Sequence, residues 1–155
     1  MDSLDMAGHL VRRLHQQSTT IFAQRTQAAG FDLTPVQFAA LDAIHTHPGS
    51  DQARVAELIG YDRATIGGVI NRLETKGWIL RVVSERDRRA RELSITQEGN
   101  RVRQALQPVV KALQDDILLP LSEADRKTFM TLARQLVWER GEADTVGTYS
   151  RIPEP

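Results

Sequence analysis

Two adjacent glycines interrupt a segment that otherwise carries the signals of a short helix. The segment DRATIGGVINRLETKG spans residues 62–77, with Asp62 as the N-terminal capping residue and Gly77 as the C-terminal stop. A glycine inside a helix costs roughly 0.8–1 kcal/mol relative to alanine, so Gly67 and Gly68 together cost about 2 kcal/mol. We therefore expect a helix that leaves part of its surface free of side chains because something bulky approaches there.

The residues around this segment predict a helix-turn-helix. Such a motif needs a small residue where its helices cross, a turn residue that tolerates positive φ, and apolar anchors on the second helix. Ala56, Gly60 and Ile66 supply these features at spacings of four and six, and Val69 is a further anchor. The first helix is expected over about 52–59 and the second over 62–77.

The outward face of the second helix is predicted to enter the major groove of DNA. An outward face usually carries long polar side chains, whereas this one is bare in the middle, which allows the close approach that a groove of about 12 Å requires. We expect Asn71 to read a base edge and Arg63 and Thr65 to contact phosphates or bases. The predicted contacts are Arg63, Ala64, Thr65, Gly67, Gly68, Asn71 and Arg72. Two alternatives remain: the glycines admit another protein helix, or they have no specific role.

An arginine-rich loop lies between two predicted strands, residues 78–83 and 91–95. The loop and the start of the second strand carry Arg86, Arg88, Arg89 and Arg91. Arginines at a hairpin tip add little to folding, but they suit the minor groove or flanking phosphates. Asp87 is interpreted as an orienting residue that holds the shape of this loop, with Arg89 as its expected partner. A merely solvated charged loop is the alternative.

The charge distribution supports a nucleic-acid partner although the chain has no net charge. Residues 52–91 contain nine basic and five acidic residues, so the positive charge is concentrated in the same segment as the predicted motif. The chain has no cysteine, which excludes disulfides, thiolate metal sites and thiol redox sensing. It shows no signal-peptide core and no membrane-spanning apolar run, so we expect a cytoplasmic protein with no membrane partner.

Long amphipathic helices are predicted on both sides of the winged unit. One spans about 3–29, and two more span about 97–118 and 122–140; Pro108 predicts a bend or a local break in the first of these two. Their apolar stripes need each other or a second chain for burial. The predicted fold is mainly α with a small β-hairpin wing. It divides into dimerisation helices (1–30 and 97–140), a winged helix-turn-helix (31–96) and a disordered tail (141–155).

Residues 30–100 resemble the multiple-antibiotic-resistance-regulator (MarR) family of winged-helix repressors. The matching stretches are LTPVQFAAL, VAELIGYDRATIGGVINRLETKGWI and RDRRARELSITQEG, and the flanking helices extend the resemblance to about 3–140. The resemblance implies an obligate homodimer with two recognition helices and two wings on a pseudo-palindromic operator in double-stranded DNA. It also implies a ligand pocket between the DNA-binding and dimerisation regions.

A candidate effector site lies on the first helix. Arg13 suits bidentate binding of a carboxylate, with His9 one turn away and His15 at the opposite edge of the apolar stripe. The expected apolar walls are Phe31, Leu33 and Phe38. The stretch HLVRRLHQQ also resembles the branch of the family that controls catabolism of hydroxybenzoates, hydroxycinnamates and nicotinate derivatives, which implies Arg13 at the carboxylate of a small aromatic acid. Alternatively, Arg12 and Arg13 are solvated or form salt bridges in the dimer.

The sequence gives weaker support for metal sensing, for protein binding and for enzymatic activity. His45 and His47 lie two residues apart and do not share a helix face, so a metal-responsive repressor is only an alternative. A helical adaptor that binds proteins through the bare helix face is another. No phosphate-binding glycine loop, nucleophile elbow or HExxH motif is present, so we predict no enzymatic activity and no resident cofactor or metal.

Overall fold

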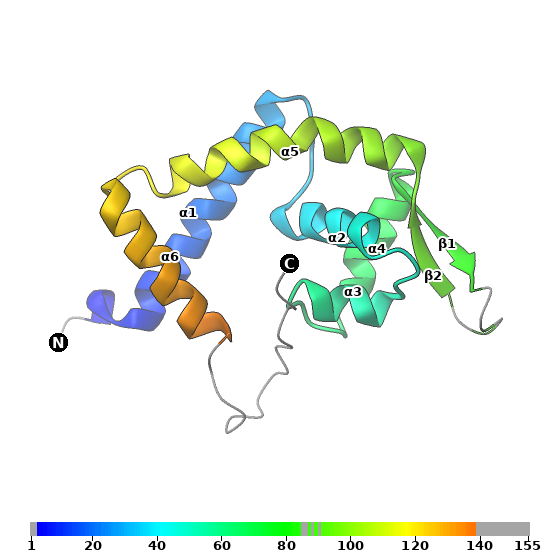
Figure 1. Cartoon of the computed structure of the whole chain (residues 1–155), viewed down its shortest axis with the longest axis horizontal. Coiled ribbons are helices and arrows are strands. Elements are labelled where there is room, and N and C mark those ends of the chain that lie inside the picture. The colour runs from blue at the N-terminus through cyan, green and yellow to red at the C-terminus, as the bar shows by residue number, and fades with distance from the viewer. Residues whose placement is uncertain (1–2, 85–86, 88, 90, 139–155) are drawn as a thin grey trace, which may run out of the picture.

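The computed structural model describes residues 3–84, 87, 89 and 91–138. It confirms a mainly helical chain with one antiparallel hairpin (Figure 1). In chain order the elements are η1 (Ser3–Asp5), α1 (Ala7–Ala28), α2 (Pro35–Thr46), α3 (Gln52–Leu58), α4 (Ile66–Thr75), β1 (Ile79–Val83), β2 (Arg91–Ile95), α5 (Gln97–Ile117) and α6 (Glu123–Trp138). None of the described helices is long and apolar enough to cross a membrane.

Side-chain caps fix where the helices begin. At α2, the Thr34 hydroxyl accepts a hydrogen bond from the Gln37 N–H at 3.3 Å, and the Gln37 side chain accepts one from the Thr34 N–H at 3.2 Å. This reciprocal pair satisfies two of the backbone donors that every helix start leaves unpaired. Thr96 caps α5 by accepting from the Gly99 N–H at 3.0 Å.

The prediction that Asp62 occupies the N-cap position of α4 is wrong by three residues, because Thr65 holds that position. The Asp62 carboxylate accepts hydrogen bonds from both the N–H and the hydroxyl of Thr65, each at 2.9 Å, and these bonds close a turn in front of the helix. The Ile66 N–H donates to the Asp62 carbonyl at 3.0 Å, so this turn leads directly into α4, which begins at Ile66. The predicted turn residue Gly60 (φ 63°) and the predicted stop Gly77 (φ 72°) both adopt the left-handed conformation.

A first hydrophobic core holds α2, α3, α4 and the hairpin together. The predicted anchors of α4, Ile66 and Val69, are buried in it, and so are Ile70 and Leu73 on the same helix. The loop between α2 and α3 also joins the hairpin, because the Leu93 N–H of β2 donates to the Ser50 carbonyl at 2.8 Å. Helix α4 is therefore fixed on one side by the core and leaves its other side exposed.

A second core forms where the C-terminal half of α1 crosses α5, next to the start of α2. It contains Phe22, Leu33, Val102, Leu106 and Leu113, and the Phe22 ring lies 6.3 Å from the Phe38 ring. Helix α5 runs without interruption through Pro108, so the predicted local break does not occur. Figure 1 shows α5 as the long element that connects the hairpin on one side with α6 on the other.

Two apolar surfaces remain exposed in the single chain. One includes Leu4, Leu10 and Val11 in the N-terminal part of the chain, and the other includes Leu132, Leu136 and Val137 of α6. These are residues that the sequence assigned to amphipathic stripes. Exposed apolar surfaces of this kind usually mark a protein-protein interface.

Candidate nucleic-acid interface

The two glycines of α4 lie in different environments. A Cβ atom added at Gly67 would lie 3.3 Å from Nε2 of Gln52, so this glycine faces the side chain of a neighbouring helix. A Cβ atom added at Gly68 would have no neighbouring heavy atom within 4 Å. The packing of the chain therefore gives a local reason for a small residue at Gly67 but none at Gly68, whose bare surface faces outward.

All of the predicted groove residues except Gly67, which is half-buried, are exposed. Asn71 and Arg72 are exposed on α4, and Arg63, Ala64 and Thr65 are exposed in the turn before it. The Asp62 carboxylate holds that turn through its two bonds to Thr65. The structure therefore brings together the helix residues that the sequence singled out, although three of them precede the helix.

Arg81 joins this surface to the hairpin, and the sequence did not single it out. Its Nη2 donates a hydrogen bond to Oδ1 of Asn71 at 2.6 Å, and its Nη1 donates to a carboxylate oxygen of Glu74. Arg81 follows the buried Ile79 by two residues on β1, so both side chains lie on the face of the strand that packs toward α4. The alternation of strand faces was the only signal in the sequence that pointed to this contact.

The hairpin has the register Ile79↔Ile95 to Val83↔Arg91, and it carries the predicted arginines at its far end. Arg89 and Arg91 are exposed. The Asp87 carboxylate accepts a hydrogen bond from the backbone N–H of Arg89 at 2.9 Å, so Asp87 acts on the backbone of the loop. Arg86 and Arg88 lie outside the described residues.

Thr96 and Gly99 hold the base of the hairpin against α5. The Thr96 N–H donates to the Trp78 carbonyl at 2.9 Å, and the Thr96 hydroxyl donates to the Gly77 carbonyl at 2.7 Å. A Cβ atom at Gly99 would lie 2.0 Å from the Trp78 carbonyl oxygen, so only glycine fits there. The sequence analysis missed this role of Gly99, because the close approach comes from a residue 21 positions earlier in the chain.

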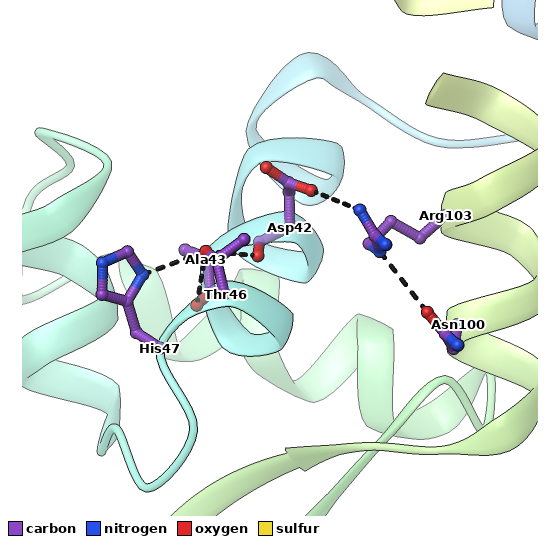
Figure 2. A network of polar contacts seen from close by, with 6 residues as sticks. All are labelled: Asp42, Ala43, Thr46, His47, Asn100 and Arg103. Atoms are coloured by element: carbon purple, nitrogen blue, oxygen red, sulfur yellow. Dashed lines mark hydrogen bonds and ion pairs between the residues drawn. The ribbon is translucent and has the colours of Figure 1, made fainter. Parts of the chain in front are cut away.

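A polar network joins α5 to α2 (Figure 2). The Arg103 side chain is 10% exposed, and its Nη1 donates to Oδ1 of Asp42 at 3.0 Å. On the same helix as Asp42, the Thr46 hydroxyl lies 3.0 Å from Nδ1 of His47. No group of three or more His, Cys, Asp or Glu side chains within the described part of the chain is arranged to hold a metal ion.

The six predicted effector residues fall into two groups within one chain. His9, Arg13 and His15 lie on the N-terminal half of α1, where Arg13 and His15 are exposed and His9 is half-buried. Phe31, Leu33 and Phe38 pack with the second core. At a rise of about 1.5 Å per residue, Arg13 lies roughly 13 Å along the helix axis from Phe22, which contacts Phe38. One chain by itself therefore does not place Arg13 against those three walls.

Comparison with known proteins decides the family. The sequence profile of the MarR family matches residues 31–90. The transcriptional regulator HosA of Escherichia coli is 32% identical over 131 residues, which cover 84% of this chain and 94% of HosA. The chain belongs to the MarR family.

Two further relatives of this MarR-family chain bear on its function. The transcriptional repressor NicR of Pseudomonas putida is 29% identical over 136 residues, covering 88% of this chain and 85% of NicR. The structure of Bordetella bronchiseptica BpsR, whose DNA binding is regulated by 6-hydroxynicotinic acid, has a TM-score of 0.81 at 26% identity. That similarity covers 93% of this chain and 99% of BpsR. The chain is a transcriptional regulator with a DNA-binding winged helix, and it is not an enzyme.

Proposed function

We propose that this MarR-family regulator is a homodimeric repressor in the cytoplasm that a small aromatic carboxylate releases from a pseudo-palindromic operator. The observation that carries the DNA-binding part is the exposed Gly68 surface of α4. It has no local packing reason to lack a side chain, and it lies between the exposed Arg63–Thr65 turn and Arg72. A bare helix flanked by cations fits a groove lined by phosphates.

The proposed dimer interface consists of the exposed apolar residues of α1 and α6. Burial of a leucine side chain stabilises an interface by roughly 1.5–3 kcal/mol, and two-fold symmetry uses each residue twice. In this proposal, residues 1–30 and 97–140 form the dimerisation region, and residues 31–96 form the DNA-binding unit. The two copies of α4 would then face successive major grooves, about 34 Å apart.

The proposed effector site contains Arg13 as the carboxylate ligand, with His9 and His15 nearby. Arg13 lies on the same half of α1 as the exposed Leu10 and Val11, so formation of the dimer determines what lies opposite it. We propose that the second subunit completes the apolar walls to which Phe31, Leu33 and Phe38 contribute. The regulation of BpsR by 6-hydroxynicotinic acid supports an aromatic carboxylic acid as the ligand class.

Equilibrium binding to DNA tests this proposal. The labelled probe is duplex DNA from the promoter beside the protein's own gene, and fluorescence anisotropy is followed over a salt series. Contact with six or more phosphates should lower the affinity by roughly 1,000-fold or more between 50 and 200 mM salt. Replacement of Arg88 and Arg89 by alanine should reduce that salt dependence while the dimer persists. Binding that is absent or independent of salt would favour the protein-binding adaptor instead.

The proposed effector is tested on the same complex of the protein with the promoter duplex. Addition of 6-hydroxynicotinate, 4-hydroxybenzoate or a hydroxycinnamate should release the duplex, because a ligand that binds the free form better shifts the population away from the DNA-bound form. Release by none of these acids would contradict the ligand class while leaving DNA binding intact.

A further inference from the structure

We propose that Arg81 determines base specificity by fixing Asn71 as a hydrogen-bond donor toward DNA. Asn71 itself would contact the base, and Arg81 would act as a positioning residue behind it. The inference rests on the proposed function, because it requires the outer surface of α4 to enter the major groove.

The bond between the two side chains fixes the orientation of the Asn71 amide. A guanidinium group carries only donors, so it can pair only with the oxygen of an amide and not with its nitrogen. The 2.6 Å contact from Nη2 of Arg81 therefore directs Oδ1 of Asn71 toward the hairpin. Among the residues that the structure describes, none accepts a hydrogen bond from Nδ2 of Asn71. The exposed Asn71 thus presents its NH₂ group for an external acceptor.

Glu74 keeps Arg81 in this position. The carboxylate of Glu74 accepts from Nη1 of Arg81 while Nη2 reaches Asn71, one helical turn earlier on α4. The planar guanidinium suits this geometry, because its separate N–H groups can serve two acceptors in a fixed arrangement. The side chain of Arg81 is 28% exposed and donates to two residues of α4, so it lies between strand and helix.

The fixed orientation of the Asn71 amide changes which base this side chain can recognise. Asparagine normally recognises adenine by donating to N7 and accepting from N6, which requires both ends of its amide. The bond from Arg81 occupies one lone pair of Oδ1 and turns this oxygen toward the hairpin, so Asn71 would meet the base with its donating NH₂ group. Guanine, which offers O6 and N7 as acceptors, and thymine, which offers O4, satisfy a pure donor. We therefore expect guanine or thymine at the base that Asn71 contacts.

Selection from a pool of randomised duplexes tests the inference with four variants of the full-length protein. Asn71→Ala identifies the base pair that Asn71 reads, because only that position should lose its preference. Arg81→Met removes the guanidinium and should move the preference at that same position toward adenine by roughly 5–30-fold. Arg81→Lys keeps the charge, but its ammonium group should pair with Glu74 and release Asn71, so the same shift is expected. Lys127→Met removes a cation from the exposed surface of α6 and should leave every preference unchanged.

Several outcomes would overturn the inference. A loss of affinity in Arg81→Met that is equal for all sequences would show that Arg81 contributes only charge. An unchanged base preference in the charge-matched Arg81→Lys would also show that Arg81 contributes only charge. This variant remains informative if Arg81→Met fails to fold. If Asn71→Ala relaxes no position, Asn71 does not read a base. A wild-type protein that selects no duplex at all would instead contradict the proposed function itself.

Discussion

Arg103 donates a hydrogen bond from Nη1 to Oδ1 of Asp42 at 3.0 Å and thereby joins α5 to α2. The Arg103 side chain is buried, whereas that of Asp42 is 41% exposed. Hydrogen bonds to charged groups contribute roughly 1.5–3 kcal/mol, and the exposure of Asp42 favours the lower end. We expect Arg103→Met to lower the free energy of unfolding by about 1–2 kcal/mol in urea denaturation.

Arg101→Met is the matched control on the same helix. Arg101 forms its ion pair with Glu98 on the exposed surface, so its loss should leave the free energy of unfolding nearly unchanged. Equal effects of the two substitutions would show that the contact between α2 and α5 does not stabilise the fold.

Gly68→Ala should change stability and DNA binding in opposite directions. Alanine favours a helix interior by about 0.8–1 kcal/mol over glycine, and the added methyl group meets no neighbour within 4 Å, so the melting temperature should rise. The same methyl group occupies the surface proposed to approach DNA, so the affinity for the promoter duplex should fall. Thermal melting and fluorescence anisotropy measure the two effects. Unchanged DNA affinity in Gly68→Ala would argue against the bare surface as the contact.

Gly99→Ala should destabilise the fold strongly although the substitution is small. The new Cβ would lie 2.0 Å from the carbonyl oxygen of Trp78, which also accepts the Thr96 N–H, so backbone must move. Such overpacking costs typically 1–3 kcal/mol, and we expect a loss of about 3 kcal/mol in urea denaturation because the clash involves backbone. A loss below about 1 kcal/mol would show that the junction between hairpin and α5 adapts easily.

Leu132→Asp should convert the proposed dimer to a monomer. A charge in the interface is costly to bury, and it appears twice under two-fold symmetry, so the dissociation constant should rise by roughly 100-fold or more. Light scattering during size-exclusion chromatography measures the molar mass directly. Leu80→Asp is the control, since Leu80 is equally exposed at 53% but lies on the hairpin. A mass that falls in both variants, or in neither, would contradict the assignment of α6 to the interface.

Arg13→Ala should preserve DNA binding and abolish the response to an aromatic acid. The guanidinium of Arg13 is proposed to bind the ligand carboxylate, and α4 and the hairpin remain untouched. Release of the duplex by 6-hydroxynicotinate, followed by anisotropy, measures the response, and Arg12→Ala should respond like the wild type. If Arg13→Ala still releases DNA at the wild-type ligand concentration, another residue binds the carboxylate.

Much of the fold was predictable because its signals act over a few residues. The capping box at Thr34 and the cap at Thr96 need only side chains within three positions, and the buried face of α4 follows from helical periodicity. The start of α4 was predicted wrongly for a related reason. Asp62 can cap either a helix or a turn that leads into one, and the local sequence does not distinguish them.

The contacts that tune the site were not predictable from local patterns. Arg81 contacts Asn71 across the boundary between strand and helix, and Gly99 is required by the carbonyl of a distant residue. The sequence likewise grouped Arg13 with Phe31, Leu33 and Phe38 by chemistry, whereas the length of α1 separates them within one chain.

The sequence alone determined the helices, the hairpin, the basic middle segment and the outward glycine of α4. Each depends on interactions between residues that are near neighbours along the chain. Only the tertiary structure decided which side chains meet across elements: Arg81 with Asn71, Arg103 with Asp42, and Gly99 with the backbone of Trp78. Those contacts depend on how packed cores orient whole elements, and a hydrogen bond requires that orientation to within a few tenths of an ångström.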